Sequence, residues 1–116
     1  MDRRHLQMAG EDAASRHLRR RGMRILHRNW RIARGELDIV AREGRTLVFV
    51  EVKTRARDDF VEPFEGVHHA KRRRLRRLAE AYCATEAPRF DRCRFDVISV
   101  VADRGALRVE HLVDAF

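Results

Sequence analysis

An apolar run at residues 47–53 ends in two charges, and it constrains the fold more than any other part of the chain. It reads Leu-Val-Phe-Val-Glu-Val-Lys, a pattern of branched and aromatic residues that is typical of a β-strand. Strand side chains alternate between faces, so Glu51 and Lys53 project from the same face as Leu47 and Phe49. An unpaired charge on such a face is costly to bury. The run therefore predicts a sheet with a polar site at the edge or end of one strand.

The lysine at position 53 is unusual in this chain. Of the 26 basic residues, only Lys53 and Lys71 are lysines, and all the others are arginines. An ammonium is a compact charge whose pKa responds to its surroundings, whereas a guanidinium stays protonated and forms a planar fork. The lysine at position 53 therefore favours a specific role for an ammonium in a site.

Length and composition indicate one globular domain over residues 1–116. A chain of this size fits a single domain with a modest core. No apolar run approaches the ~20 residues that span a bilayer, and the first residues lack the apolar core of a signal peptide. We therefore expect a cytoplasmic protein. Cys83 and Cys93 lack the spacing of a zinc site, and we expect reduced, structural thiols.

The formal net charge of +8 indicates attraction to polyanions, with nucleic acid as the first such partner and an acidic membrane surface as the second. An arginine-rich composition can also reflect codon bias, which would leave the charge without a partner. The charge is therefore a moderate indication of nucleic-acid binding.

Hydrophobic periodicity predicts a mixed α/β fold in the order αβββαββ. The expected elements are a helix over about 7–21, strands over 23–30, 36–42 and 46–54, a helix over about 67–85, and strands over 95–101 and 107–113. The second helix, of about 19 residues, permits a parallel, right-handed crossover between the third and fourth strands. We therefore expect a mixed sheet flanked by helices.

The turn between the second and third strands fixes their register. The Gly-Arg pair at 44–45 suits a two-residue type II′ hairpin loop. In that register Asp38 lies opposite Glu51, and Glu36 lies opposite Lys53. Directly opposed residues have Cβ atoms about 5 Å apart, so Asp38 and Glu51 could share a cation and would repel each other without one.

Glu11 lies on the inward stripe of the first helix, three residues before Ala14 and seven before Leu18. It is therefore expected to point toward the body of the protein. The alternative is a first-turn carboxylate that the helix dipole stabilises. Sequence alone leaves both interpretations open.

The second helix is basic on the side away from its apolar stripe, which carries Lys71, Arg72, Arg73, Arg74, Arg76 and Arg77. A solvated face is the ordinary explanation of such a run. No compensating acids are interleaved, however, and this favours a helix that faces phosphates.

Asp38 and Glu51 offer hard oxygen ligands suited to Mg²⁺ or Mn²⁺, and the backbone carbonyl of Val52 is an additional candidate ligand. Lys53 would lie beside the cation. Such a site can coordinate a phosphodiester oxygen and lower the pKa of a bound water, while the lysine orients that water or stabilises charge at phosphorus. Glu11 could add a ligand or hold a water. The simple alternative is a structural salt bridge between Glu51 and Lys53 beside an exposed Asp38.

The set Asp38…Glu51-Val52-Lys53, with Glu11 ahead of it, resembles the PD-(D/E)xK nuclease superfamily, and its spacing is similar to that of archaeal Holliday-junction resolvases. Over nearly the whole chain the sequence more closely resembles the YraN family of small bacterial proteins. The segments that carry this second resemblance are Gly10-Glu11 with Ala14, Arg28-Asn29, residues 35–40, residues 49–55, Lys71, residues 94–97 and Ala115-Phe116.

The resemblance implies a nuclease-like, restriction-endonuclease-like domain that hydrolyses phosphodiester bonds with Mg²⁺ or Mn²⁺, on branched or structured DNA. It makes Asp38 and Glu51 metal ligands, Lys53 the catalytic lysine and Glu11 an auxiliary carboxylate. Leu37 stands where the superfamily's name expects proline, a departure that removes one diagnostic letter and no chemistry. DNA is a more natural partner than RNA, and the analogy with resolvases is compatible with a homodimer.

Two further residues carry separate expectations. Arg55, next on the face of Glu51, is either a phosphate contact or an ordinary surface arginine. Asp96 follows Phe95 in a predicted strand, and we expect it to pair with a nearby arginine and not to join the site. Three functions remain in competition: a metal-dependent endonuclease, a non-catalytic nucleic-acid-binding module on the same fold, and a protein-interaction component whose charge is compositional.

Overall fold

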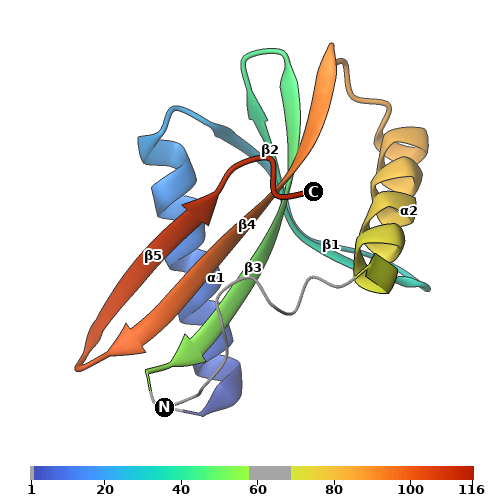
Figure 1. Ribbon diagram of the computed structural model, residues 1–116. Helices are drawn as coiled ribbons and strands as arrows, with labels where there is room; N and C mark the ends of the chain where they lie inside the picture. The colour runs from blue at the N-terminus through green and yellow to red at the C-terminus, as the bar shows by residue number, and fades with distance from the viewer. Residues whose placement is uncertain (1, 58–68) are drawn as a thin grey trace.

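Figure 1 shows the computed structural model, a five-stranded mixed sheet that packs against two helices. The structure describes residues 2–57 and 69–116. In chain order its elements are α1 (Arg3–Arg20), β1 (Arg24–Ile32), β2 (Gly35–Glu43), β3 (Thr46–Ala56), α2 (His69–Glu86), β4 (Arg92–Asp103) and β5 (Ala106–Leu112).

The strands lie in the sheet in the order β1-β2-β3-β4-β5. Neighbours are antiparallel except β3 and β4, which are parallel because α2 carries the chain back between them. The predicted mixed sheet with one parallel crossover is therefore confirmed.

Several element ends differ from the predicted ones. Helix α1 begins at Arg3 and not at residue 7, because Asp2 caps it: its Oδ1 accepts a hydrogen bond from the backbone N–H of His5 at 2.8 Å. Strand β4 begins three residues early, since Arg92 already lies opposite Thr46 of β3. The predicted start of the second helix at residue 67 lies outside the described residues.

The β2–β3 hairpin has the predicted register. Glu43 lies opposite Thr46, and the ladder continues in step to Ile39 opposite Val50. Gly44 has φ +59°, the positive value that a type II′ turn requires at its first central residue. A one-residue slip would have moved every following side chain to the other face of the sheet, so this turn determines which residues can meet.

The ladder between β2 and β3 ends at the Ile39–Val50 pair, and the strands then separate. In Figure 1, β1 and the start of β2 turn toward α2, while β3 continues past them. Glu36 therefore does not lie opposite Lys53, and that prediction is wrong. It faces Arg31 of β1 instead, with Arg31 Nε 2.6 Å from Glu36 Oε2.

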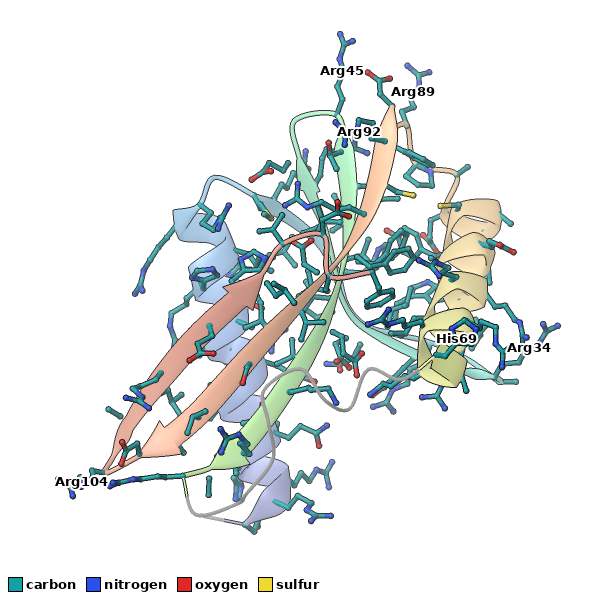
Figure 2. All side chains as sticks on the ribbon, in the orientation of Figure 1. Arg34, Arg45, His69, Arg89, Arg92 and Arg104 are labelled. Carbon is teal, nitrogen blue, oxygen red and sulfur yellow. The ribbon has the colours of Figure 1, made fainter. Side chains whose placement is uncertain are left out.

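An apolar layer lies on each face of the sheet, one between the sheet and α1 and the other between the sheet and α2. Figure 2 shows the side chains that fill these two layers. On the α1 side the core contains Ala14, Leu18, Ile39, Val48, Val50 and Ile98. On the α2 side it contains Val40, Leu47, Phe49, Leu75, Leu78 and Tyr82. Because β3 is covered on both faces, its first residues form a continuous apolar run, and Glu51 follows Leu47 and Phe49 toward α2.

Neither helix of the described chain is long and apolar enough to cross a membrane. Cys83 and Cys93 are both free cysteines. Cys93 is exposed, whereas Cys83 is half-buried against the α2 side of the core.

Candidate functional site

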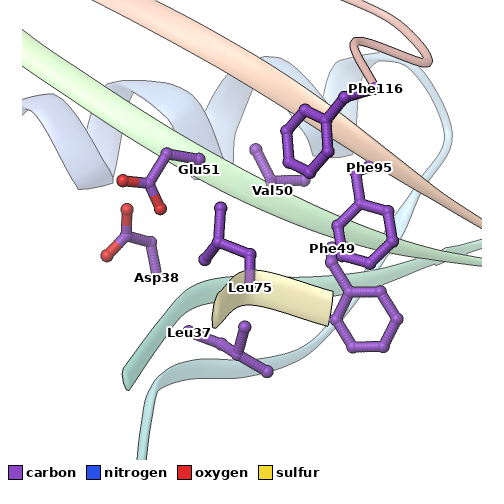
Figure 3. A pocket seen from close by; sticks show the side chains of 8 residues that line it. All are labelled: Leu37, Asp38, Phe49, Val50, Glu51, Leu75, Phe95 and Phe116. Atoms are coloured by element: carbon purple, nitrogen blue, oxygen red, sulfur yellow. The ribbon is translucent and has the colours of Figure 1, made fainter. Parts of the chain in front are cut away.

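Asp38 and Glu51 lie where β2 separates from β3, one position beyond the last pair of the ladder. Figure 3 shows their carboxylates facing each other. Asp38 Oδ2 accepts a hydrogen bond from the backbone N–H of Val52 at 2.8 Å, and so satisfies a strand donor that β2 no longer pairs. The register thus brings together the two acids that the sequence predicted to meet.

Val52 enters the site through its backbone. Its N–H donates to Asp38, and a strand residue directs its N–H and C=O toward the same neighbouring strand. The Val52 carbonyl therefore faces the same gap between β2 and β3, where the sequence placed it as a candidate ligand.

The surroundings of Asp38 raise the pKa of its carboxyl to about 8. Burial is the main cause, because it disfavours the charged form, and the charge of Glu51 is the second. The charge of Glu11 adds to the shift, whereas the hydrogen bond from Val52 opposes it. At neutral pH Asp38 is therefore largely protonated.

Lys71 of α2 reaches into this group. Its Nζ lies 2.7 Å from Glu51 Oε1, and the two side chains are 27% and 13% exposed. The prediction that Lys71 belongs to an outward basic face is therefore wrong. The spacing carried a signal, since Lys71 precedes Leu75 and Leu78 by four and seven residues and so extends the buried stripe of α2.

Lys53 lies beside Lys71, so the only two lysines of the chain meet at this site. Burial lowers the pKa of Lys53, and the charge of Lys71 lowers it further, while Glu51 and Asp38 act in the opposite direction. The ion-pair partner that the structure gives Glu51 is Lys71. The simple alternative of a Glu51–Lys53 salt bridge is not what the structure shows.

Glu11 approaches from α1 and is 6% exposed, as expected for an inward position. Because α1 begins at Arg3, Glu11 lies in the middle of the helix, and the first-turn alternative is wrong. Its Oε1 accepts a hydrogen bond from Asn29 Nδ2 at 3.2 Å. Its charge contributes to the raised pKa of Asp38, so Glu11 acts on the acid pair electrostatically.

Asn29 is a member of this site that sequence reasoning missed. It has φ +53° within β1, a left-handed conformation that asparagine tolerates better than most residues. Two signals were available: asparagine is uncommon inside strands, and Arg28-Asn29 is one of the segments that carry the family resemblance. The unusual backbone accompanies a side chain that holds Glu11.

Gly10 explains how α1 comes close enough for Glu11 to reach the site. A Cβ atom added at Gly10 would lie 2.0 Å from Thr54 Oγ1 and 2.6 Å from Thr54 Cγ2, both on β3. Any larger residue would push the helix away from the strand. The glycine therefore sets the helix–strand distance beside Glu11.

The prediction of a single outward basic side of α2 fails at Lys71, which pairs with Glu51. Arg73, Arg74, Arg76 and Arg77 are exposed. Arg72 and Arg76 lie over the ring of Phe116, with their Cζ atoms 5.3 and 5.6 Å from its centroid. Arg55 is half-buried on β3, next to the site along the strand.

A recess adjoins the two acids and holds about 200 Å³ of empty space, open solvent included. Figure 3 shows its lining, which is apolar except for the acids and consists of Leu37, Asp38, Phe49, Val50, Glu51, Leu75, Phe95 and Phe116. Phe116 stacks on Phe95 with ring centroids 5.0 Å apart. The acids therefore adjoin an apolar wall on one side.

Asp96 is fully buried and lies in a separate network. Arg94 Nε donates to its Oδ1 at 3.0 Å, and His111 Nε2 lies 2.8 Å from its Oδ2. Burial opposes ionisation, but the hydrogen bonds from His111 and Arg94 outweigh it and lower the pKa of Asp96. The expectation that Asp96 pairs with an arginine is confirmed.

The acid pair fits a magnesium-like ion better than a zinc-like one. Over residues 2–57 and 69–116, no three His, Cys, Asp or Glu side chains are arranged to hold a metal ion by themselves. Mg²⁺ is usually bound by one or two carboxylates together with water and substrate phosphates. Burial and, second, the charge of Glu51 raise the pKa of Asp38, and such a cation would relieve the repulsion between the two carboxylates.

The description "Uncharacterised protein family UPF0102" belongs to the family that matches residues 10–100, a range that contains every acid and lysine of this site. A UPF0102 protein of Dictyoglomus thermophilum is 39% identical over 118 residues, covering 100% of both chains. UPF0102 proteins of Beutenbergia cavernae and Rhodococcus opacus are 50% and 44% identical over 89% and 92% of this chain, and over 88% and 92% of their own.

Proposed function

The chain belongs to the UPF0102 family, the YraN-like family that its sequence resembles, and from its site we propose a divalent-metal-dependent endonuclease of the PD-(D/E)xK type. The observation that carries this proposal is the meeting of Asp38, Glu51 and Lys53 at the point where β2 leaves β3. The proposed substrate is nucleic acid, and DNA more than RNA.

Asp38 and Glu51 are the residues that would hold Mg²⁺ or Mn²⁺, with the Val52 carbonyl as a further oxygen. When bound, such an ion polarises a phosphodiester oxygen and lowers the pKa of the attacking water. The Val52 N–H fixes the orientation of the Asp38 carboxyl before any ion arrives. The apolar lining of the recess beside the acids offers few polar partners, and electrostatic interactions are stronger in such surroundings than in water.

Lys53 supplies positive charge to the reacting phosphate. Its lowered pKa makes its ammonium a better proton donor than an ordinary surface lysine, which suits a group beside a leaving oxygen. The same ammonium stabilises the charge that develops at phosphorus. Glu11, held by Asn29, is a positioning residue that adjusts the electrostatics of the acid pair.

Exposed arginines of α2 give the substrate a place to bind near the site. Arg73, Arg74 and Arg77 project to solvent from the same helix that carries Lys71. Arginine contacts to phosphates release counterions, and this is the main source of sequence-independent affinity for nucleic acid. The net charge of +8 acts in the same direction.

A second candidate function is a non-catalytic nucleic-acid-binding module on the same fold. One observation favours it: without a cation, the acids are already compensated by Lys71 and by protonation of Asp38. Binding to nucleic acid that persists in EDTA, with no cleavage under any metal condition, would support this alternative.

Cleavage assays separate the two functions. The purified chain would be incubated with plasmid, single-stranded and four-way-junction DNA and with matched RNA, in Mg²⁺, Mn²⁺ or EDTA. We expect metal-dependent cleavage that Glu51→Gln and Lys53→Ala abolish. Glu36→Gln is the matched control, because Glu36 is a carboxylate of β2 that pairs with Arg31 outside the site. Cleavage that survives in Glu51→Gln would identify a contaminating nuclease.

A further inference from the structure

Lys71 departs from the pattern of its helix in two respects. It is one of two lysines among 26 basic residues, and it stands directly before an arginine run. It also lies on the buried stripe of α2, and its side chain is 27% exposed while the neighbouring Arg73 and Arg74 are exposed. A residue selected only for positive charge on a solvated face would need neither feature.

The contact of Lys71 is with a residue that would hold the cation. Its Nζ lies 2.7 Å from Glu51 Oε1. The ammonium therefore pairs with one of the two carboxylate oxygens that a divalent ion would need as ligands. The chemistry of the side chain matters here. An arginine would pair with Glu51 through two parallel hydrogen bonds, whereas an ammonium is a single point charge that can leave more easily.

The charges of the cluster support an exchange. A cation would bind the fully ionised form of the cluster, in which Glu11, Asp38 and Glu51 carry three negative charges and Lys53 and Lys71 carry two positive ones, an excess of one negative charge. A divalent cation would convert this to an excess of one positive charge. One phosphodiester, with a single negative charge, would then restore neutrality.

Resting on the proposed function, we propose that Lys71 is an internal counter-ion that competes with the divalent cation for Glu51, and that cation binding releases its ammonium to a substrate phosphate. The site then binds nucleic acid more strongly when the cation is present, because the same event that fills the acid pair frees a phosphate ligand. Lys53, on β3, stays beside the reacting group, while Lys71, on α2, changes partner.

Binding of Mn²⁺ alone tests the competition, without nucleic acid and without turnover. Titration calorimetry would compare the full-length protein with Lys71→Met, Lys71→Arg and Arg73→Met. Lys71→Met removes the competitor and is expected to raise Mn²⁺ affinity about three- to tenfold. Lys71→Arg is expected to lower it, because a forked partner holds Glu51 more firmly. Arg73→Met removes an equal charge from the exposed face and is expected to change affinity less than twofold.

The outcomes distinguish this inference from the proposed function. Mn²⁺ binding that is equal or weaker in Lys71→Met overturns the competition while the metal site stands. Absence of Mn²⁺ binding in every variant overturns both. For the release step, Ca²⁺ would replace the catalytic ion in DNA-binding measurements: Ca²⁺ should tighten DNA binding by the unmodified protein, and this gain should be lost in Lys71→Met. An equal gain in both proteins overturns the release to phosphate.

Discussion

Asp38 is a residue whose charged form the folded protein disfavours. Its pKa rises from 3.8 to about 8, mainly because it is buried and lies against Glu51. A raised carboxyl pKa means that the folded state holds the proton more tightly than the unfolded chain does. The stability that this proton provides is therefore complete below about pH 4 and is lost as the pH rises through about 8.

Asp38→Asn is therefore expected to stabilise the metal-free protein at high pH. An amide keeps an acceptor for the Val52 N–H but carries no charge. One pKa unit corresponds to about 1.4 kcal/mol, so the free energy of unfolding at pH 8 should rise by on the order of 2 kcal/mol or more. Urea unfolding in EDTA at pH 4 and pH 8 measures this, with Glu36→Gln as the control. An equal effect of Asp38→Asn at both pH values would contradict the raised pKa.

Some residues of the candidate site could be predicted from the sequence, and others could not. Asp38 and Glu51 were predictable as a pair, because one glycine turn fixes the register between them. The position of Lys71 in the site was not predictable in this way. Lys71 stands beside several other basic residues of α2, and their shared charge draws attention away from its place on the apolar stripe of the helix. The role of Asn29 was not predictable either. A left-handed residue inside a strand depends on tertiary contacts, and a local sequence pattern does not indicate those contacts.

Among the elements, α1 and β3 are in unusually close contact at Gly10. A methyl group there would overlap the Thr54 side chain at 2.0 Å from Oγ1. Gly10→Ala should therefore destabilise the protein by about 1–3 kcal/mol and move Glu11 away from the acid pair. Thermal unfolding of Gly10→Ala, Thr54→Ala and the double variant tests this. We expect the double variant to recover part of the loss, and strictly additive effects would show that the two residues do not touch.

Helix α2 carries a separate prediction about nucleic-acid binding. If Arg73 and Arg77 contact phosphates, replacing both with glutamine should weaken DNA binding and reduce the slope of log affinity against log salt by about 1.8 for duplex DNA. Arg104→Gln with Arg108→Gln is the matched control, because both residues are exposed, and Figure 2 shows Arg104 at the far end of the sheet from α2. Equal loss in both double variants would mean that the charge acts without a defined surface.

The helices and strands themselves were largely predictable from the sequence. The residues at which they begin or end, and the point where β2 separates from β3, were not. The apolar run of β3 and the stripe of α2 are strong periodic signals that depend on nearby residues. The start of α1 depends on the single cap at Asp2. The ladder between β2 and β3 ends where β1 and the start of β2 turn toward α2, and no local sequence pattern marks this point. The candidate site lies at that separation, so this part of the site was the hardest to predict.

For the molecule as a whole, the acids and lysines of the site come from four elements. Glu11 comes from α1, Asp38 from β2, Glu51 and Lys53 from β3, and Lys71 from α2. A cation bound by the acids would therefore restrain both helices and the sheet together. Binding that is specific to the folded state stabilises it by an amount set by ligand concentration and affinity.

Mn²⁺ is accordingly expected to raise the melting temperature of the whole protein. At 100 times the dissociation constant the gain is about 2.7 kcal/mol, which for a domain of this size corresponds to roughly 10 °C. Differential scanning calorimetry in Mn²⁺, in EDTA and in NaCl of equal ionic strength separates site binding from screening. The gain should disappear in Glu51→Gln and remain in Glu36→Gln, since only Glu51 joins the cluster. Equal melting temperatures in Mn²⁺ and EDTA would instead mean that Lys71 and the Asp38 proton are the permanent counter-ions of these acids, as the non-catalytic alternative requires.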